Sequence, residues 1–379
     1  MRRFLIHLTA FGALPALLLL AGEAVLLGSG ELWPLDRVIA YQGAHPDARY
    51  LRAVDQVFYA YKYRGLVVKR PSVLVAGSSR TMKFRARMFG DRADAFFNAG
   101  GMLNSVRDVR DFAETPPPGW RPSVLVLGID LWWFNDGVPP VYSFRSQIDQ
   151  DVGRRFDDHV IALRWLALHP RSLAIELRSL GDGRLDAIGI EARERGGGFR
   201  ADGSYVVRVA VPRAPDAWRF VDRETPPIIE RVTGAIANFP PARQASTARL
   251  AMLDAALARF ESQHVLVVGY LPPFSSAVLD ALRHDARHRG LWSDFDCRVP
   301  EVFRRHRFPV VDASDATRFG MDDRAMSDGI HAEETFHLHV VRALLQDDRV
   351  RAALPGADAA VARALASPRT NYWQADLGS

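Results

Sequence analysis

The sequence predicts an α/β protein built on a doubly wound, mostly parallel five-stranded sheet. Short runs of β-branched and aromatic residues alternate with segments whose apolar residues recur at helical spacing. Alternation of this kind indicates a parallel sheet with helices on both faces. The chain has 379 residues, of which 48% are hydrophobic, enough to bury the core of one large domain or two small ones.

An apolar N-terminal segment comes first. Arg2 and Arg3 precede residues 4–22, which contain no Asp, Glu, Lys or Arg, and apolar character resumes after Glu23. About 20 residues of this kind cross a hydrocarbon core as a helix, and the preceding arginines favour a cytoplasmic N-terminus. We therefore expect residues 1–28 to be an uncleaved single-pass anchor in the cytoplasmic membrane, with the main domain in the periplasm. A signal peptide cleaved near Gly22 is the alternative.

The rest of the chain divides by composition. Residues 29–70 are mixed and aromatic and are expected to form a juxtamembrane segment. The α/β domain is expected at residues 71–350. Its predicted strands are residues 73–76, 95–98, 124–127, 265–268 and 309–312, and its predicted helices are residues 81–92, 104–114, 242–263, 275–289 and 333–345.

Residues 136–241 interrupt this alternation with glycine and proline clusters. We expect them to form an insertion over the carboxyl edge of the sheet and not an independent domain. Within the insertion, Asp202-Gly203 predicts a hairpin turn that leads into a strand at Tyr205. Residues 351–379 are rich in alanine and are expected to be a peripheral tail.

Charge and cysteine usage exclude several classes of protein. The net charge is +5, but the 49 basic and 44 acidic residues are intermixed and form no basic stripe, which argues against nucleic-acid binding. Cys297 is the only cysteine, so no internal disulfide or CxxC motif is possible. We expect no cofactor and no metal site, because His331, His337 and His339 match no strong zinc spacing.

The first predicted strand ends in Gly77-Ser78-Ser79-Arg80. Ligands of an open α/β sheet bind beyond the carboxyl ends of its strands. A serine on a tight turn from strand to helix exposes its hydroxyl, and its N–H points with the helix dipole toward an anion. This geometry suits a nucleophile. The alternative is that Ser78, Ser79 and Thr81 only cap the helix.

Two further motifs follow later strands. In Asn98-Ala99-Gly100-Gly101, the N–H of Gly100 is a candidate second oxyanion donor, although a plain glycine turn explains the motif as well. In Asp328-Gly329-Ile330-His331, side chains three residues apart point to the same side. Asp328 can hold one nitrogen of His331 and leave the other to accept a proton from a serine hydroxyl. A capping aspartate beside a surface histidine is the alternative.

In this order and on this fold, the G-x-S, N-x-G-G and D-x-x-H motifs resemble those of the SGNH, or GDSL-type, hydrolase superfamily, over roughly residues 72–345. The resemblance implies a flavodoxin-like, three-layer fold. It also implies that Ser79 is the nucleophile, that the N–H groups of Ser79 and Gly100 form the oxyanion hole, and that Asp328 and His331 complete the triad. Ser78 is the alternative nucleophile if the register differs by one.

One motif departs from the superfamily pattern. Gly128-Ile129-Asp130-Leu131 stands where G-x-N-D is usual, so Asp130 replaces an oxyanion-stabilising asparagine. An ionised carboxylate there would oppose the developing oxyanion. We therefore expect Asp130 to turn away, to be protonated, or to hold Arg80 or an acceptor hydroxyl. Asn104 and Asn135 are alternative oxyanion donors.

The anchor, the GSSR and GID motifs and the insertion together look like a membrane-anchored envelope branch of this superfamily, similar to the alginate O-acetylation proteins and the teichoic acid D-alanyl transfer protein. The resemblance implies an acyltransferase or esterase that forms acyl-Ser79, acts on O-acyl groups of a cell-envelope polymer and works beside a membrane-bound O-acyltransferase. Trp132 and Trp133 are then a candidate platform for sugar rings. The alternative is a catalytically silent scaffold that binds glycan or docks onto such an acyltransferase.

Overall fold

The structure is a computed structural model that describes residues 2–53, 58–139, 156–179, 186–206, 225–371 and 373–377. The chain forms two compact units. The first comprises Met1–Ala60, Asp149–Ala201 and Tyr205–Val209, and the second comprises Tyr61–Ile148, Asp202–Ser204 and Ala210–Ser379. Much of the predicted juxtamembrane segment and the middle of the predicted insertion therefore belong to one unit, whereas both ends of the insertion belong to the other. Parts of the insertion lie outside the described residues.

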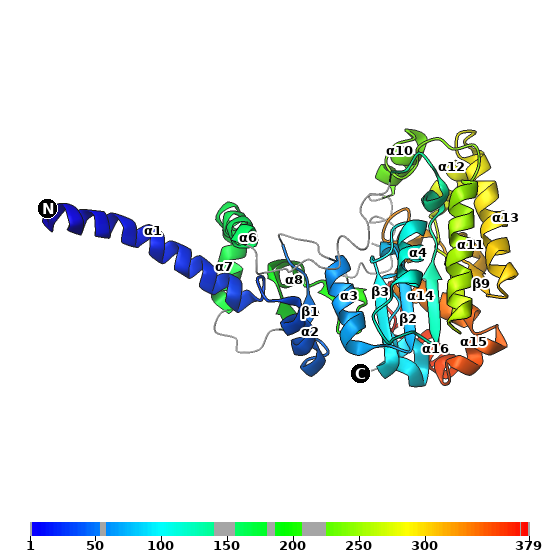
Figure 1. The fold of residues 1–379 in the computed structure, drawn as a ribbon, viewed down its shortest axis with the longest axis horizontal. Helices are drawn as coiled ribbons and strands as arrows, with labels where there is room; N and C mark the ends of the chain where they lie inside the picture. Colours follow the sequence, from blue (N-terminus) through cyan, green and yellow to red (C-terminus); the bar gives the residue numbers. More distant parts are fainter. Residues whose placement is uncertain are drawn as a thin grey trace. The chain divides into compact units, whose positions relative to one another are not determined.

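The second unit contains the predicted sheet. Its strands are β2 (Val73–Gly77), β3 (Phe96–Gly100), β4 (Val124–Gly128), β8 (Leu266–Leu271) and β9 (Val310–Asp312). They are all parallel and lie in the order β3-β2-β4-β8-β9 (Figure 1). This is a doubly wound order, because β3 lies on one side of β2 and the next strand in the chain, β4, lies on the other side. The α/β prediction is confirmed, and the crevice between the ends of β2 and β4 is where such sheets bind ligands.

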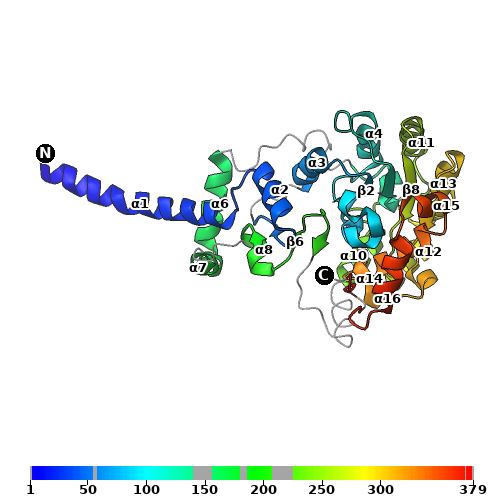
Figure 2. The same ribbon diagram turned by 90° about the horizontal axis from the view of Figure 1, so that it is seen from below.

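Helices cover both faces of this sheet (Figure 2). Val75, Val126 and Val268 share a core with η2 (Ala86–Ala95), α14 (Glu334–Leu344) and α16 (Ala357–Ala366). The opposite layer contains α4 (Val106–Glu114), α11 (Thr247–Ser262) and α13 (Arg289–Arg305), and Gly269 of β8 lies against Phe303 of α13. The remaining elements of this unit are α3 (Phe58–Lys69), η1 (Ser79–Thr81), η3 (Leu131–Phe134), α10 (Pro226–Thr233), α12 (Ser276–His284), η4 (Ala316–Phe319), η5 (Asp323–Ala325) and α15 (Asp348–Ala353).

The prediction of a helix at residues 81–92 is wrong. The segment instead forms the short 3₁₀ turn η1 and the interrupted 3₁₀ segment η2, whose regular geometry breaks at Phe89 and Gly90. Gly90 has a φ of 59°, and a Cβ on it would collide with the backbone at Gly356 just before α16. The close approach of α16 therefore requires glycine here and ends the regular helical geometry.

The C-terminal residues are not peripheral, so that prediction is also wrong. Ala357, Val361 and Ala364 of α16 are buried in the same core as the sheet. Trp373 is buried as well, and its indole N–H donates to the carbonyl of Arg324. The alanine-rich composition reflects close packing of a helix against its neighbours.

The first unit is smaller and contains the N-terminal helix. Its elements are α1 (Arg2–Ser29), α2 (Leu35–Ala44), α6 (Phe156–Leu168), α7 (Pro170–Ser179), α8 (Ile190–Arg195), β1 (Arg49–Tyr50), β5 (Ala187–Ile188), β6 (Gly198–Phe199) and β7 (Tyr205–Val206). The strands form a small sheet in the order β5-β1-β6-β7, in which β6 and β7 are antiparallel, as the predicted hairpin requires. Within α1, Phe11–Ser29 has a mean hydropathy of 1.9 and is long enough to cross a membrane.

Candidate active site

Ser79 is the first residue of η1, directly after β2. Ser78 is the buried N-cap of this turn, and its hydroxyl accepts a hydrogen bond from the N–H of Arg80 at 3.3 Å. Ser79 itself is exposed, although both of its neighbours are buried. The two predicted roles are thus divided between adjacent serines, because Ser78 caps the turn and Ser79 presents its hydroxyl.

Glycines at three strand ends make room for η1. A Cβ added to Gly77 would lie 2.9 Å from Thr81 Cγ2, and one added to Gly100 would lie 2.6 Å from Thr81 Oγ1. A Cβ on Gly128 would also collide with Thr81 Cγ2. Thr81 is fully buried, and its hydroxyl donates to the Ser78 carbonyl at 2.9 Å. The strand-end glycines of β2, β3 and β4 therefore allow the turn that carries Ser79 to sit close against the sheet.

The structure brings Ser79, His331 and Asp328 together. Ser79 Oγ lies 2.8 Å from His331 Nε2, and His331 Nδ1 lies 2.7 Å from Asp328 Oδ2. The other oxygen of Asp328 accepts the backbone N–H groups of Ile330 and His331, at 2.7 and 2.8 Å. The Ser79–His331 and His331–Asp328 distances are both within the hydrogen-bond range that a nucleophile, its base and the group that orients the base require.

The environment of Asp328 favours its charged form. Burial pushes the pKa of Asp328 up, but the imidazole of His331, the hydrogen bond to it and the two backbone N–H groups together lower this pKa below its usual range. An ionised Asp328 accepts the Nδ1–H of His331 and fixes the tautomer in which Nε2 is free to accept a proton. His331 is thereby set up as a base toward Ser79.

Arg80 contacts the segments that follow β4 and β8 and the D-x-x-H loop in the interior of the site. Its guanidinium donates to Asp130 Oδ1 at 3.0 Å, to the Ile330 carbonyl at 2.8 Å and to the Pro273 carbonyl. Arg80 and Asp130 are each 2% exposed or less. Burial raises the pKa of Asp130, and the neighbouring Arg80 opposes that rise. Among the predicted roles of Asp130, holding Arg80 matches this geometry.

Two more ion pairs join the segment after Ser79 to the segment after His331. Lys83 Nζ lies 2.7 Å from Glu333, and both side chains are buried. Arg85 lies 3.4 Å from Glu334, farther along both segments. With the Arg80–Ile330 hydrogen bond, these contacts fix the position of the D-x-x-H loop relative to η1, on which the distance from Ser79 to His331 depends.

Of the predicted oxyanion donors, Ser79 is the one whose N–H has no hydrogen bond among the described residues. The Gly100 N–H donates to Asn98 Oδ1 at 2.7 Å, so its predicted role is not supported. The amide group of Asn135 donates to the Pro240 carbonyl at 2.6 Å, and that of Asn104 donates to the Gly101 carbonyl at 3.1 Å. These asparagine amides hold loops in place in this structure.

The predicted sugar platform is not present in this structure. Trp132 is 8% exposed and Trp133 is 1% exposed, so neither ring offers a face to a ligand. Trp132 instead packs edge-on against Phe239 and lies 5.3 Å from the guanidinium of Arg80. Both residues therefore belong to the core at this strand end, and Phe239, near the end of the insertion, is one of the side chains that cover Trp132.

The segment directly after β8 also contributes to the site, and no sequence motif predicts this contribution. Pro273 accepts a hydrogen bond from Arg80, and the ring of Phe274 lies 4.3 Å from the Arg80 guanidinium. The sequence signal is a proline pair and an aromatic residue that begin four positions after the fourth predicted strand and directly follow β8. Proline and phenylalanine are not reactive residue types. Their role here depends on the side chain of Arg80, which follows a different strand, β2.

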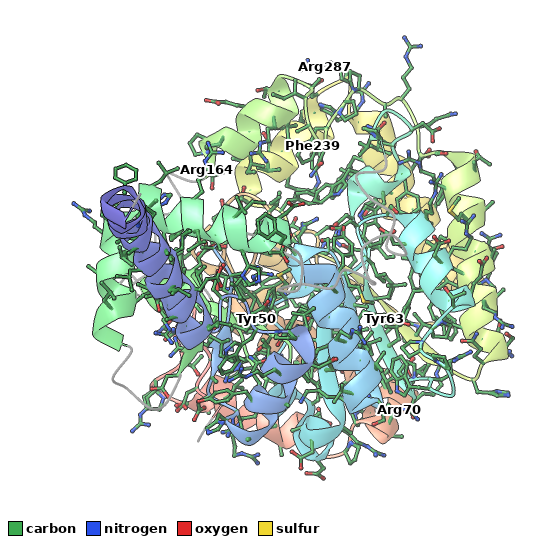
Figure 3. The ribbon with its side chains drawn as sticks, turned by 60° about the vertical axis from the view of Figure 1, so that its left-hand side comes forward. Tyr50, Tyr63, Arg70, Arg164, Phe239 and Arg287 are labelled. Carbon is green, nitrogen blue, oxygen red and sulfur yellow. The ribbon has the colours of Figure 1, made fainter. Side chains whose placement is uncertain are left out.

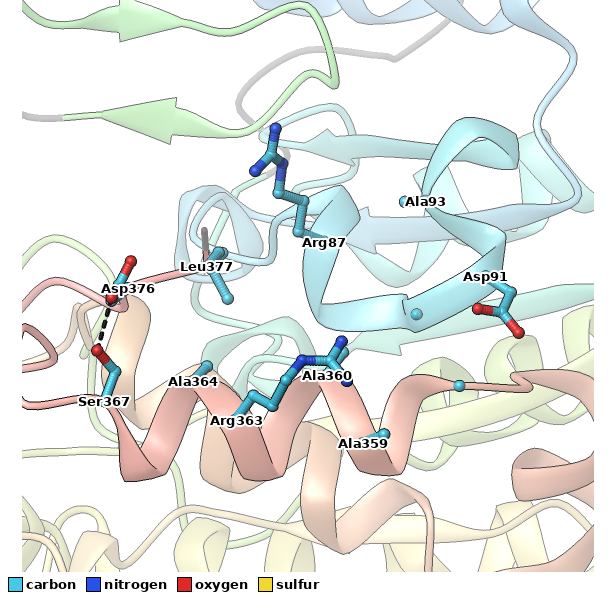
Figure 4. Close-up of a pocket in the computed structure, with 12 residues that line it drawn as sticks. Arg87, Asp91, Ala93, Ala359, Ala360, Arg363, Ala364, Ser367, Asp376 and Leu377 are labelled. Atoms are coloured by element: carbon cyan, nitrogen blue, oxygen red, sulfur yellow. Dashed lines mark hydrogen bonds between the residues drawn. The ribbon is translucent and has the colours of Figure 1, made fainter. Parts of the chain in front are cut away.

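The structure also contains a cavity of about 480 Å³ between η2 and α16, which includes Arg87, Arg363 and Asp91 in its lining (Figure 4). None of its lining residues belongs to the Ser79 site. Among the residues that the structure describes, no group of histidine, cysteine, aspartate and glutamate side chains is arranged to hold a metal ion.

Comparison with known proteins adds no relative. No family model matches the chain, and no curated protein matches it. The resemblance to the SGNH hydrolases therefore remains a prediction that rests on the motifs quoted above.

Proposed function

We propose that this protein is a membrane-anchored serine esterase or acyltransferase that forms an acyl-Ser79 intermediate. The observation that carries the proposal is the continuous chain from Ser79 Oγ to His331 Nε2 at 2.8 Å and from His331 Nδ1 to Asp328 at 2.7 Å. These three residues come from motifs about 250 positions apart, and capping or turn formation alone gives no reason for them to meet.

The reaction follows from this geometry. Ser79 Oγ attacks the acyl carbonyl carbon while His331 Nε2 accepts the hydroxyl proton, and Asp328 stabilises the resulting imidazolium. The Ser79 N–H, at the start of η1, stabilises the oxyanion. His331 then returns the proton to the leaving alcohol. Water or an acceptor hydroxyl then attacks the carbonyl carbon of acyl-Ser79 while His331 accepts its proton. His331 passes this proton to Ser79 Oγ as the ester bond to Ser79 breaks, which completes hydrolysis or transfer.

The proposed location and substrate class rest on the N-terminal helix and on the motif resemblance. With Arg2 and Arg3 on the cytoplasmic side, α1 would place the second unit outside the cytoplasmic membrane. The proposed substrates are O-acyl groups of a cell-envelope polymer, and the partner that the resemblance implies is a membrane-bound O-acyltransferase. The triad geometry requires only an acyl carbonyl within reach of Ser79, and the choice of an ester rests on the motif resemblance.

A fluorophosphonate probe tests the proposal directly. The purified full-length protein in detergent should become labelled at Ser79, because His331 activates its hydroxyl. Ser79→Ala should abolish labelling, and Ser78→Ala is the matched control because it removes the neighbouring hydroxyl from a capping position. Full labelling of the Ser79→Ala protein would overturn the assignment.

The second candidate is a catalytically silent scaffold, favoured by the state of the predicted oxyanion hole. The N–H of Gly100 is engaged by Asn98, and Asp130 stands where the superfamily has an asparagine. Each missing oxyanion donor lowers the rate by roughly 10²–10³-fold. If the protein is a scaffold, Ser79→Ala should complement a deletion strain fully. If it is an enzyme, Ser79→Ala should fail to complement.

A further inference from the structure

Exposed apolar side chains concentrate on three helices of the first unit. Among the described residues, every large apolar side chain with high exposure lies on α1, α6 or α7, except Val68 and Ile236. On α1 this is expected of a membrane span. On α6 and α7 it needs a separate explanation, because these helices lie within the part of the chain that follows the span. The residues concerned on α6 and α7 are Phe156, Val160, Ile161, Leu168, Ile175 and Leu177.

These two helices pack beside the C-terminal end of α1 (Figure 1). Ala162 and Leu166 of α6 are buried in one apolar cluster with Val25 and Leu26 of α1. A Cβ on Gly22 would collide with Leu163 of α6, so the two helices approach closely at that residue. One side of α6 is therefore buried against α1, and the opposite side carries the exposed apolar residues.

The contact occurs where α1 would leave the hydrocarbon. The stretch without Asp, Glu, Lys or Arg spans residues 4–22, and about 20 helical residues cross a bilayer core. Glu23 follows directly, and its carboxylate lies 2.8 Å from His159 Nδ1 of α6. Residues 17–20 of α1, before this pair, are exposed leucines, whereas Val25 and Leu26 after it are buried against α6. We therefore expect the membrane–water boundary near Glu23, at the level of α6.

Charged side chains on these helices suit the same level. Arg164 is exposed on α6 between the apolar positions and is labelled in Figure 3, and Arg171 is exposed at the start of α7. Arginines among apolar residues are typical of helices that lie at a lipid surface. The guanidinium reaches the lipid phosphates while the aliphatic part of the side chain lies along the apolar surface. Asp157 is also exposed on α6, near its N-terminus, where a negative charge is favourable.

We propose that α6 and α7 form a second membrane contact that lies in the outer interface of the bilayer crossed by α1. The occupant of the exposed apolar face is the boundary between lipid headgroups and acyl chains. The inference rests on the membrane location proposed for α1 and is independent of the acyl chemistry at Ser79. It assigns the first unit a role beyond a single-helix tether, because a helix pair on the surface limits how the unit can rotate about α1.

Site-specific fluorescence tests this inference, and the single cysteine makes the design simple. Cys297→Ser removes the one native thiol, and Ile161→Cys, Ile236→Cys or Phe11→Cys then introduces one labelling site for an environment-sensitive dye. Ile161 and Ile236 are matched, with 51% and 57% exposure, and Phe11 reports on the anchor. The full-length protein is reconstituted into vesicles of phosphatidylethanolamine and phosphatidylglycerol that contain nitroxide-labelled lipid.

The dye at position 161 should be quenched by nitroxide placed near the headgroups roughly threefold more than the dye at position 236, as expected for a face buried about 5–10 Å. Iodide in the buffer should show the reverse preference. Equal quenching by iodide at both positions overturns the inference, and so does shielding of position 161 from both quenchers, because protein would then cover this face. Leu168→Cys provides a second site if Ile161→Cys does not fold.

The remaining positions separate this inference from the proposals on which it depends. Lipid quenching at position 11 without quenching at position 161 leaves the anchor intact and overturns the second contact. Position 11 lies near the middle of the span, so it is read with nitroxide placed deep on the acyl chains, and absence of that quenching overturns both. Fluorophosphonate labelling of Ser79 in the same vesicles reports on the acyl chemistry alone.

Discussion

At the scale of single residues, Arg80 is the side chain on which the site depends most after the triad. Its guanidinium has three neighbouring acceptors, one each from the segments after β4 and β8 and from the D-x-x-H loop. A planar group with several fixed donors can satisfy such a set, whereas a lysine ammonium cannot reproduce its geometry. We therefore expect Arg80 to be a positioning residue, which would act on Ser79 and His331 through the backbone.

Separate removal of the two charges in the Arg80–Asp130 pair should be costly. Asp130→Asn keeps the shape but leaves a buried guanidinium without its counter-charge, and we expect a loss of about 3–5 kcal/mol in the free energy of unfolding. Arg80→Met should cost a similar amount and should also slow fluorophosphonate labelling, because it releases the Ile330 carbonyl beside His331. Denaturant unfolding of the purified protein measures the first effect, and labelling kinetics measure the second.

The control is an exposed ion pair on α13. Glu301 and Arg304 are 50% and 67% exposed, and Glu301→Gln should change the free energy of unfolding by less than about 1 kcal/mol. If Asp130→Asn is no less stable than Glu301→Gln, the buried pair does not stabilise the site. If Arg80→Met is labelled as fast as the wild-type protein, Arg80 has no positioning role.

At the scale of elements, the strands and the order of motifs could be predicted from sequence. All five strands of the main sheet lie where continuous apolar runs predicted them, because parallel strands buried on both faces have no polar alternation to obscure the signal. Ser79, Asp328 and His331 could be found because each is a reactive residue type at a strand end or before a helix. Their convergence could not be derived from spacing, since it depends on contacts such as that between Lys83 and Glu333.

Other elements depended on packing partners that are distant in sequence. The segment containing η2 has helical spacing, but its geometry is decided by α16, which approaches Gly90 from the end of the chain. The N-x-G-G motif predicts an oxyanion donor, whereas Gly100 instead leaves room for Thr81. The position of Trp132 and Trp133 after a strand predicts a surface platform, because the segment near Phe239 that contacts Trp132 lies about 105 residues later in the chain.

The packing of η1 against the strand ends gives a test at this scale. Gly128→Ala places a methyl group against Thr81 Cγ2, and we expect the shifted turn to slow fluorophosphonate labelling of Ser79 by at least about tenfold, since displacements of about 1 Å can cost 10²-fold in rate. Thr81→Ser removes Cγ2 and keeps the hydroxyl that donates to Ser78. The double variant Gly128→Ala/Thr81→Ser should therefore recover most of the labelling rate. Failure of Thr81→Ser to rescue Gly128→Ala would show that the collision is not the cause.

At the scale of the whole molecule, the stability of the second unit is tied to the same region as its chemistry. His337 of α14 is fully buried below the site, where its Nδ1–H donates to the Glu333 carbonyl at 2.8 Å and its ring packs against Phe84 and Tyr270. Burial lowers the pKa of His337 to about 4. The folded protein thus holds this imidazole neutral at a pH at which an unfolded chain would protonate it.

This shift predicts loss of stability in mild acid. The unfolded chain binds a proton at His337 near its ordinary pKa of about 6.5, whereas the folded protein does so only near 4. Between these values the unfolded state binds more protons, so stability falls as the pH falls through this window, by about 3 kcal/mol in total. His337→Gln should flatten this part of the pH dependence in denaturant unfolding, whatever its effect at neutral pH. His284→Gln, which removes an exposed imidazole from α12, should keep the wild-type slope. A His337→Gln protein with the wild-type slope between pH 6.5 and 4 would show that other groups, such as buried carboxylates, account for the acid sensitivity.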